Sequence, residues 1–145
     1  MIGMIVSGHG HFASGLQVSA KMIAGERENV RYIDFEEGMG PDKLGELLSA
    51  AYTELGHCDG IVVLTDLPGG CPFQTAVAVS MQHPDKKIEV LAGTNLPMIV
   101  TGVTLIDFEE DPAAVAAELL ETGKEFIVRF ELVEREEEAE EEDGI

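Results

Sequence analysis

The sequence places a histidine between two glycines, directly after an apolar run that is typical of a buried strand. The run covers residues 2–6, and residues 7–11 after it read Ser-Gly-His-Gly-His. In open parallel α/β sheets, ligands bind outside the carboxyl ends of the strands. An imidazole can act as a nucleophile at neutral pH, or take and give a proton there. His9 is therefore the first candidate for a catalytic residue.

A carboxylate follows a second apolar run in the same way. Residues 60–65 are apolar throughout, as expected of a parallel strand that is covered on both faces, and Asp66 comes next. Neighbouring strands lie about 4.8 Å apart, so Asp66 reaches His9 if the two strands are adjacent. An aspartate that accepts from one ring nitrogen fixes the tautomer and leaves the other nitrogen's lone pair as a nucleophile. We predict a catalytic pair of His9 and Asp66.

A glycine-rich segment after Asp66 leads into a helix. Gly69, Gly70 and Cys71 precede Pro72, a residue favoured in a first helical turn. Free N–H groups at a helix N-terminus form an anion site when glycines let the backbone come close. We predict that Gly69, Gly70 and Cys71 form a phosphate-binding loop beside the histidine. Cys71 is unusual at the cap position, because a thiol caps less well than a hydroxyl.

A third loop, residues 93–95, opens on the same edge of the expected sheet. We therefore place Gly10, Phe73 and Asn95 at the rim of the site. His11 lies two residues after His9, and a His-x-His pair with an aspartate can bind a metal ion. No third or fourth ligand is obvious, so we expect no metal, and we expect no cofactor.

The elements that must position these residues alternate between strand and helix. Strands are predicted at 2–6, 30–35, 60–65 and 88–91, and helices at 14–23, 41–55, 72–81, 96–105 and 112–122. This order predicts an α/β fold, a doubly wound and mostly parallel four-stranded sheet with helices on both faces. Residues 126–133 alternate in part, which predicts a C-terminal edge strand, on the chain's own sheet or on a partner's.

Composition limits the class of protein. The chain has 145 residues and is 45% hydrophobic, so residues 1–133 fit one domain with a single core. Residues 134–143 hold eight acids and one base, and we predict that 134–145 are a disordered acidic tail. The formal net charge of −19 argues against nucleic acid and anionic membrane surfaces as partners, and favours basic partners.

Cysteine usage and the start of the chain predict a cytoplasmic protein. Cys58 and Cys71 are too few for a disulfide framework, and their spacing matches no zinc pattern. The N-terminus shows no basic segment of a signal peptide. No apolar stretch approaches the ~20 residues that a membrane-spanning helix needs.

Two other functions compete with a nucleophilic histidine. The pattern Gly8-x-Gly10-x-x-Ala13, with Asp34 at the end of the second strand, matches the glycine fingerprint of dinucleotide-binding modules. A non-catalytic regulatory domain of the same fold is the other alternative, in which the loop is kept and the chain works by binding. Binding of a nicotinamide cofactor would favour the dinucleotide-binding module. Partner binding and function that are retained after His9→Ala would favour the regulatory domain.

Three segments together resemble the mannose-family enzyme IIA domain of the bacterial phosphoenolpyruvate-dependent sugar phosphotransferase system. They are residues 7–10, 65–73 and 93–98, which occur in the family's order. The stretch Asp-x-x-Gly-Gly-x-Pro-Phe, starting at Asp66, is the most specific of them. Cys71 departs from the pattern, because a serine is common there.

The resemblance implies a phosphoryl carrier. His9 takes a phosphoryl group from the phosphohistidine of HPr and passes it to a IIB component during sugar uptake, while Asp66 orients the imidazole. Gly70 and Cys71 supply the loop around the phosphoryl group. The resemblance further implies a homodimer that meets the membrane only through the permease. It also implies that residues 126–133 form a C-terminal antiparallel edge strand, which some members of the family exchange between the two subunits.

Overall fold

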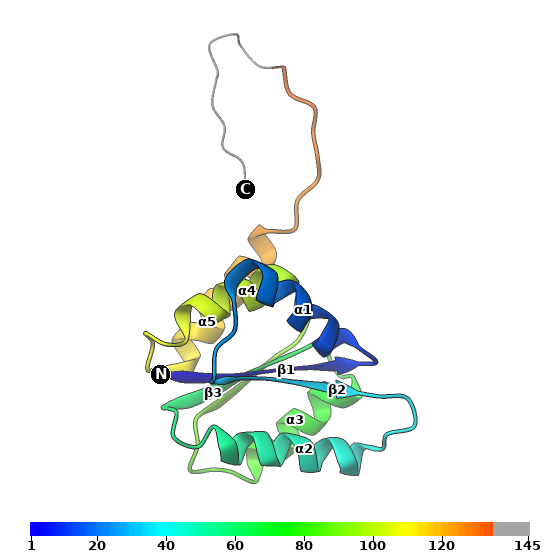
Figure 1. Cartoon of the computed structure of the whole chain (residues 1–145), viewed down its shortest axis with the longest axis vertical. Coiled ribbons are helices and arrows are strands. Elements are labelled where there is room, and N and C mark those ends of the chain that lie inside the picture. The colour runs from blue at the N-terminus through cyan, green and yellow to red at the C-terminus, as the bar shows by residue number, and fades with distance from the viewer. Residues whose placement is uncertain (135–145) are drawn as a thin grey trace.

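The computed structural model describes residues 1–134, and these form one four-stranded sheet with five helices (Figure 1). In chain order the elements are β1 (Ile2–His9), α1 (Phe12–Ala24), β2 (Val30–Phe35), α2 (Pro41–Glu54), β3 (Gly60–Thr65), α3 (Cys71–Met81), β4 (Ile88–Leu91), α4 (Leu96–Leu105) and α5 (Pro112–Glu125). The predicted alternation of strands and helices is confirmed. Apart from Glu134, the acidic tail predicted for 134–145 lies outside the described residues.

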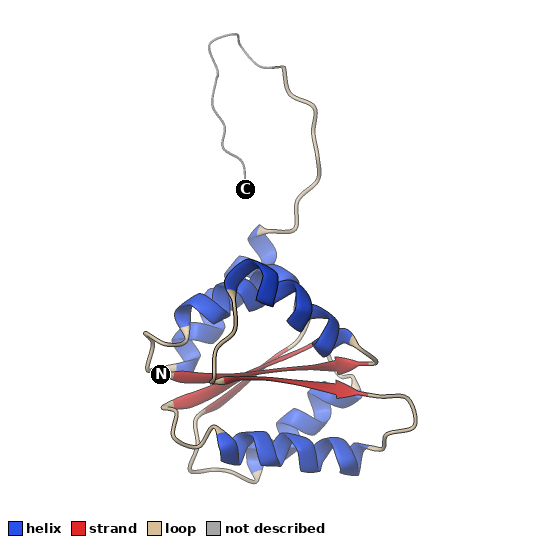
Figure 2. Cartoon of the chain, in the orientation of Figure 1, coloured by secondary structure: helices blue, strands red, loops and turns tan. Residues whose placement is uncertain are grey.

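The sheet has the order β2-β1-β3-β4, and every neighbouring pair is parallel. Helices α1, α4 and α5 cover one face, and α2 and α3 cover the other (Figure 2). The chain leaves β1 toward β2 on one side and returns to place β3 on the other side. The strand order therefore reverses between β1 and β3, and such a switch point is where open α/β sheets bind ligands.

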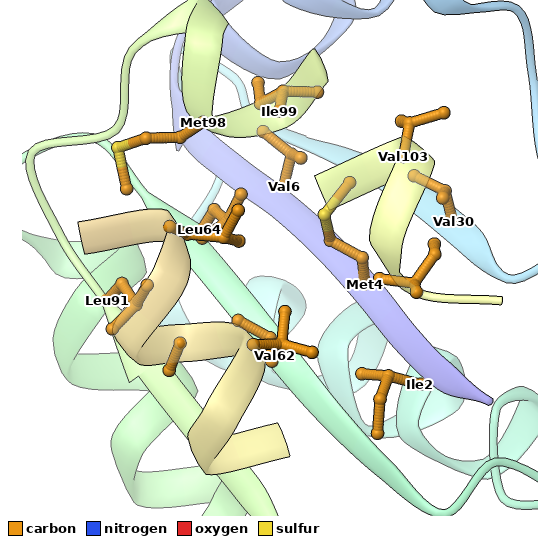
Figure 3. Packing of buried hydrophobic residues seen from close by; sticks show 14 of the residues in the cluster. Ile2, Met4, Val6, Val30, Val62, Leu64, Leu91, Met98, Ile99 and Val103 are labelled. Atoms are coloured by element: carbon orange, nitrogen blue, oxygen red, sulfur yellow. The ribbon is translucent and has the colours of Figure 1, made fainter. Parts of the chain in front are cut away.

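The central strand β1 is buried on both faces, which explains why its sequence is apolar without alternation. Ile2, Met4 and Val6 point toward α4 and α5 together with Val62 of β3, as Figure 3 shows. Ile5 points to the opposite face and packs among residues of α2 and α3. Each fully buried aliphatic side chain contributes about 1.5–3 kcal/mol, so the strand that ends at His9 is firmly anchored.

Residues 127–134 follow α5 without helix or strand structure. Phe126 is the C-cap residue of α5, and the large apolar side chains from Phe126 onward are exposed, from 62% for Phe126 to 90% for Leu132. The described sheet thus does not include the edge strand predicted for 126–133. A strand is stable only when a neighbouring edge pairs with its backbone, and this segment runs away from the sheet in the single chain (Figure 1).

No helix among residues 1–134 is long and apolar enough to cross a membrane.

Candidate functional site

His9 is the last residue of β1, so the strand is longer than the sequence predicts. The extension exists because β1 continues to pair with β2, with His9 opposite Phe35, and because the Gly10 amide donates to the Phe35 carbonyl at 2.8 Å. Gly10 then adopts a φ of 60°, which reverses the chain into α1 and favours glycine. The residues before His9 are buried, whereas its own side chain is 45% exposed.

Asp66 follows β3, the strand that lies directly beside β1. Its Oδ2 accepts hydrogen bonds from the His9 main-chain amide at 2.9 Å and from the His9 ring Nδ1 at 2.7 Å. Its Oδ1 accepts from the Leu67 amide at 2.8 Å. The structure therefore brings together the two side chains that strand adjacency predicted to meet.

The environment keeps Asp66 negatively charged. Burial raises the pKa of the carboxyl, but the hydrogen bonds from the His9 amide, the His9 ring and the Leu67 amide outweigh it, and the net pKa lies below its ordinary value. An ionised carboxylate can only accept hydrogen bonds, so Nδ1 of His9 carries the proton. In the neutral ring the lone pair is then on Nε2, the nitrogen that does not face Asp66.

Two neighbours confine the imidazole ring. Phe35 of β2 meets it edge to face, with ring centroids 5.7 Å apart and planes at 76°. Gly70 lies on another side, where an added Cβ would come within 3.1 Å of His9 Cε1. The ring is thus held by one hydrogen bond and two contacts, and each comes from a different segment of the chain.

The N-terminus of α3 lies next to this ring. Gly70 is the N-cap residue and Cys71 is the first helical residue, which corrects the placement of Cys71 at the cap. The amides of a first helical turn have no partner within the helix, and in α3 they belong to Cys71 and Phe73, because Pro72 has no N–H. Such amides are suited to bind phosphate oxygens.

The loop before α3 is held in shape by its own hydrogen bonds. Gly69 adopts a φ of 76°, a conformation that side chains other than glycine rarely take. The Gln74 side chain donates to the Gly69 carbonyl at 2.7 Å, and the Gln74 amide donates to the Gly70 carbonyl at 2.9 Å. Gln74 was not a sequence candidate, and its position four residues into the helix was the only signal.

The predicted rim residues have different surroundings. Gly10 makes the turn after His9, and Phe73 is half-buried in the first turn of α3. Asn95 caps α4, where its Oδ1 accepts from the Met98 amide at 3.3 Å, and its Nδ2 donates to the Gly123 carbonyl at 3.0 Å. The Asn95 side chain therefore holds α4 against α5.

The residues of the dinucleotide pattern serve the start of α1. Asp34 accepts from the Ser14 amide at 2.9 Å and from the Ser14 hydroxyl at 2.6 Å. A Cβ added to Gly8 would come within 2.5 Å of the Phe12 ring, so this ring covers the glycine. The pattern is explained by packing, and Ser14 is a partner of Asp34 that the sequence did not reveal.

No group of three potential metal-ligating side chains occurs in the described part of the chain. His11 is 84% exposed, and its Nδ1 lies 3.5 Å from Asp34 Oδ2.

A groove of about 530 Å³ runs between α2 and α3, and neither His9 nor Asp66 lines it. The candidate site is thus an exposed imidazole at the edge of the sheet.

Comparisons with known proteins agree on one family. The chain is 37% identical over 128 residues to the PTS system mannose-specific EIIAB component of Escherichia coli K12, which covers 86% of this chain and 38% of that protein. It is 32% identical over 105 residues to the PTS system fructose-specific EIIA component of Bacillus subtilis 168. This match covers 72% of this chain and 70% of that protein. The chain spans about 38% of the length of the E. coli relative.

A solved structure has the same fold. The crystal structure of phosphotransferase system component EIIA from Streptococcus agalactiae superposes with a TM-score of 0.81 at 36% identity, covering 89% of this chain and 97% of that one. The family model EIIA-man, described as PTS system fructose IIA component, matches residues 3–120. With that match over most of its length, the chain belongs to the EIIA-man family of phosphotransferase system components.

Proposed function

We propose that this chain is a cytoplasmic phosphoryl carrier of a sugar phosphotransferase system, which accepts a phosphoryl group from phosphorylated HPr on His9 and passes it to a IIB component. The observation that carries the proposal is the 2.7 Å hydrogen bond between His9 Nδ1 and Asp66 Oδ2. This bond leaves Nε2 as the free nucleophile, on a ring that is 45% exposed.

The transfer exchanges one nitrogen–phosphorus bond for another. The Nε2 lone pair of His9 attacks the phosphorus of the donor phosphohistidine, the donor's nitrogen–phosphorus bond breaks, and the donor imidazole keeps that electron pair. The His9 ring becomes positively charged as its new bond forms, and the Asp66 carboxylate stabilises this charge. A IIB imidazole then attacks the same phosphorus and restores neutral His9.

Positioning supplies most of the catalysis in such a reaction, because the bonds broken and formed are alike. The His9 ring is already held by Asp66, Phe35 and Gly70. The first-turn amides of α3, from Cys71 and Phe73, supply donors for phosphoryl oxygens. The role of Cys71 is then carried by its main chain, so the thiol in place of the family's common serine is compatible with transfer.

The exposed position of His9 suits a protein donor. A small molecule is normally bound in a concave pocket, whereas a phosphohistidine on another protein must meet the acceptor at an open surface. The net charge of −19 favours a basic partner, and charge attraction speeds the formation of transient complexes.

Intact-mass measurement tests this function. The chain is incubated with phosphoenolpyruvate, enzyme I and HPr, and we expect one added phosphoryl group that is lost in acid. His9→Gln should stay unmodified, while His57→Gln, which changes an exposed histidine before β3, should be modified like the wild type. An unmodified wild-type chain would contradict the proposal.

We also propose that residues 126–133 form an antiparallel edge strand in a homodimer. Phe126, Ile127, Val128, Phe130, Leu132 and Val133 are between 62% and 90% exposed in the single chain. So many large apolar side chains in one short segment favour association. The test compares the oligomeric state in solution of the full chain and of a chain that ends at Glu125. We expect the full chain to be a dimer and the shortened chain to be a monomer. The same oligomeric state in both chains would contradict the exchange.

A further inference from the structure

The His9 ring lies on the side of the sheet that α2 and α3 cover. Side chains alternate along a strand, so His9 shares a face of β1 with Ile5, which packs among residues of α2 and α3. The contact with α3 agrees, because a Cβ built at Gly70 would lie 3.1 Å from His9 Cε1. A protein that reacts with this ring therefore also meets the neighbouring parts of α2 and α3.

The groove between α2 and α3 begins at the same edge of the sheet. The two helices lie side by side, and each follows the carboxyl end of a strand, so both N-termini lie at the edge that holds the site (Figure 1). The lining starts with Pro41 and Gln74 and continues along both helices as far as Ser49 and Gln82. Gln74 also connects the groove to the phosphate-binding loop, because its side chain donates to the Gly69 carbonyl at 2.7 Å.

Helix α3 has no charged side chain, although 26% of the chain is charged. Ala78 and Met81 follow Gln74 by four and seven residues, so the three share one face of the helix. All three are exposed, Met81 to 75%, and Leu67, in the loop beside Gly70, is 59% exposed. Protein–protein interfaces have this composition, because charged residues are depleted at their centre and methionine is enriched.

The other wall of the groove is acidic. Asp42 and Glu46 of α2 line it, and no lysine or arginine of residues 1–134 does. Lys43 lies 3.9 Å from Glu46, but both side chains are exposed, so this pair is weak. The α2–α3 surface, defined as the exposed face of α3 together with Asp42 and Glu46, is thus uncharged on one side and negative on the other. It complements a partner that carries lysine or arginine side chains.

The size of a protein interface brings this surface within reach of the site. A specific interface buries about 800 Å² on each partner. Helix α3 has 11 residues and is about 16 Å long, and its first turn lies beside His9. A donor protein seated on His9 therefore covers more than the loops around the ring.

We propose that the α2–α3 surface docks the protein that donates the phosphoryl group, phosphorylated HPr, and that lysine or arginine side chains of this donor face Asp42 and Glu46. The inference rests on the proposed function of His9. It assigns the affinity for a protein donor to residues other than those that hold the imidazole.

The first test measures kcat and KM for acceptance from phosphorylated HPr in the wild type and in Ala78→Arg. The substitution puts a long, positively charged side chain into the middle of the surface, at an exposed position of a helix that arginine favours. We expect KM to rise about tenfold or more, with kcat within about twofold of the wild type. Ala117→Arg is the matched control, an exposed alanine of α5 on the other face of the sheet, and should keep the KM of the wild type (Figure 2).

A small donor separates docking from chemistry. Phosphoramidate has one nitrogen–phosphorus bond, and His9 takes its phosphoryl group as ammonia leaves. Because this donor needs no docking surface, Ala78→Arg should accept from it at the rate of the wild type. An equal loss with both donors would show that the substitution disturbs the site itself, and would overturn the inference.

The acidic wall is tested by removing its charge. In the double variant Asp42→Asn with Glu46→Gln, we expect KM for phosphorylated HPr to rise about three- to tenfold at low salt and less at high salt. Glu118→Gln with Glu125→Gln removes the same number of charges from exposed positions of α5 and should have a smaller effect. Equal effects of the two double variants would show that net charge alone attracts the donor, which overturns the docking of basic side chains at this wall.

Three further outcomes are decisive. An unchanged KM in Ala78→Arg overturns the inference and leaves the proposed function intact. A change in the oligomeric state of Ala78→Arg, measured by sedimentation, would assign the surface to a second copy of the chain and would also overturn it. A larger rise in KM for Val18→Arg, at an exposed position of α1, would place the donor on the other face of the sheet, with the same consequence. A wild type that accepts from neither donor overturns the proposed function itself.

Discussion

A single oxygen of Asp66 accepts hydrogen bonds from both the main-chain amide and the ring Nδ1 of His9, at 2.9 and 2.7 Å. The carboxylate thus fixes the position of the backbone and the orientation of the imidazole together. Both bonds depend on β1 and β3 being neighbours in the sheet. The candidate site is therefore a direct result of the strand order.

Asp66→Asn should lower phosphoryl acceptance by about a hundredfold or more. The amide keeps the shape of the side chain, but it loses the charge that stabilises the imidazole as phosphorus is attacked. Rapid-quench measurement of phosphoryl transfer from phosphorylated HPr gives the rate. A variant as fast as the wild type would show that the carboxylate only supports the fold.

The stability contributed by Asp66 should disappear in acid. Its pKa is lower in the folded chain than in the unfolded chain, so the contribution is complete above the ordinary aspartate pKa of about 4 and is lost as the pH falls through the folded value. Urea unfolding of the wild type and Asp66→Asn between pH 7 and pH 3 tests this. The free-energy gap should be constant above about pH 5 and should narrow below about pH 4. A gap that widens in acid would contradict the direction of the pKa shift.

Gly70→Ala should slow transfer by about tenfold with little loss of stability. The new Cβ would lie 3.1 Å from His9 Cε1 and 3.3 Å from the Leu67 carbonyl, so the ring must shift by a few tenths of an ångström. Gly40→Ala is the control, because a Cβ there meets nothing within 4 Å. Transfer rates and urea unfolding of both variants separate an effect on the ring from an effect on the fold. Equal rates in the two variants would contradict the contact.

Gly60→Ala should destabilise the chain by about 1–3 kcal/mol. A Cβ at this first residue of β3 would come within 2.5 Å of Pro112 Cγ and 3.0 Å of the Lys87 carbonyl. Gly15→Ala, at the fourth residue of α1, meets nothing within 4 Å and should stabilise by about 0.5–1 kcal/mol, because alanine favours the helix. Chemical unfolding measures the change in the free energy of unfolding for both variants. A Gly60→Ala chain as stable as the wild type would refute the close contact between β3 and α5.

The pairing of His9 with Asp66 could be predicted because parallel strands bring their carboxyl ends to one edge. Each residue follows an apolar run, and the runs identify the strands without knowledge of the tertiary structure. That β1 and β3 are neighbours was a condition of the prediction, and the sheet order confirms it.

The contacts of Asp34 and Phe35 could not be predicted in this way. They depend on the register of β2 beside β1, and on α1 beginning at Phe12, two residues before the predicted start. Asp34 therefore matched the pattern of dinucleotide-binding modules, whereas in the structure it accepts hydrogen bonds from Ser14. Contacts between segments that are distant in sequence require the register, which local patterns do not encode.

Residues 126–133 show a different limit. Their partial alternation predicts a strand, but alternation does not identify the edge that pairs with it. In the single chain the segment follows α5 without pairing, and its apolar side chains stay exposed. If the partner edge belongs to a second molecule, neither the pattern nor one chain can contain it.

The two hydrogen bonds from His9 to Asp66 also constrain how a carrier of this kind binds its donor and its acceptor. Because the main chain and the ring of His9 both donate to Asp66, the imidazole cannot move a phosphoryl group from one binding surface to another. Donor and acceptor must then occupy the same face in succession, and each excludes the other while bound. An excess of either one, without phosphate on it, would act as a competitive inhibitor of the relay.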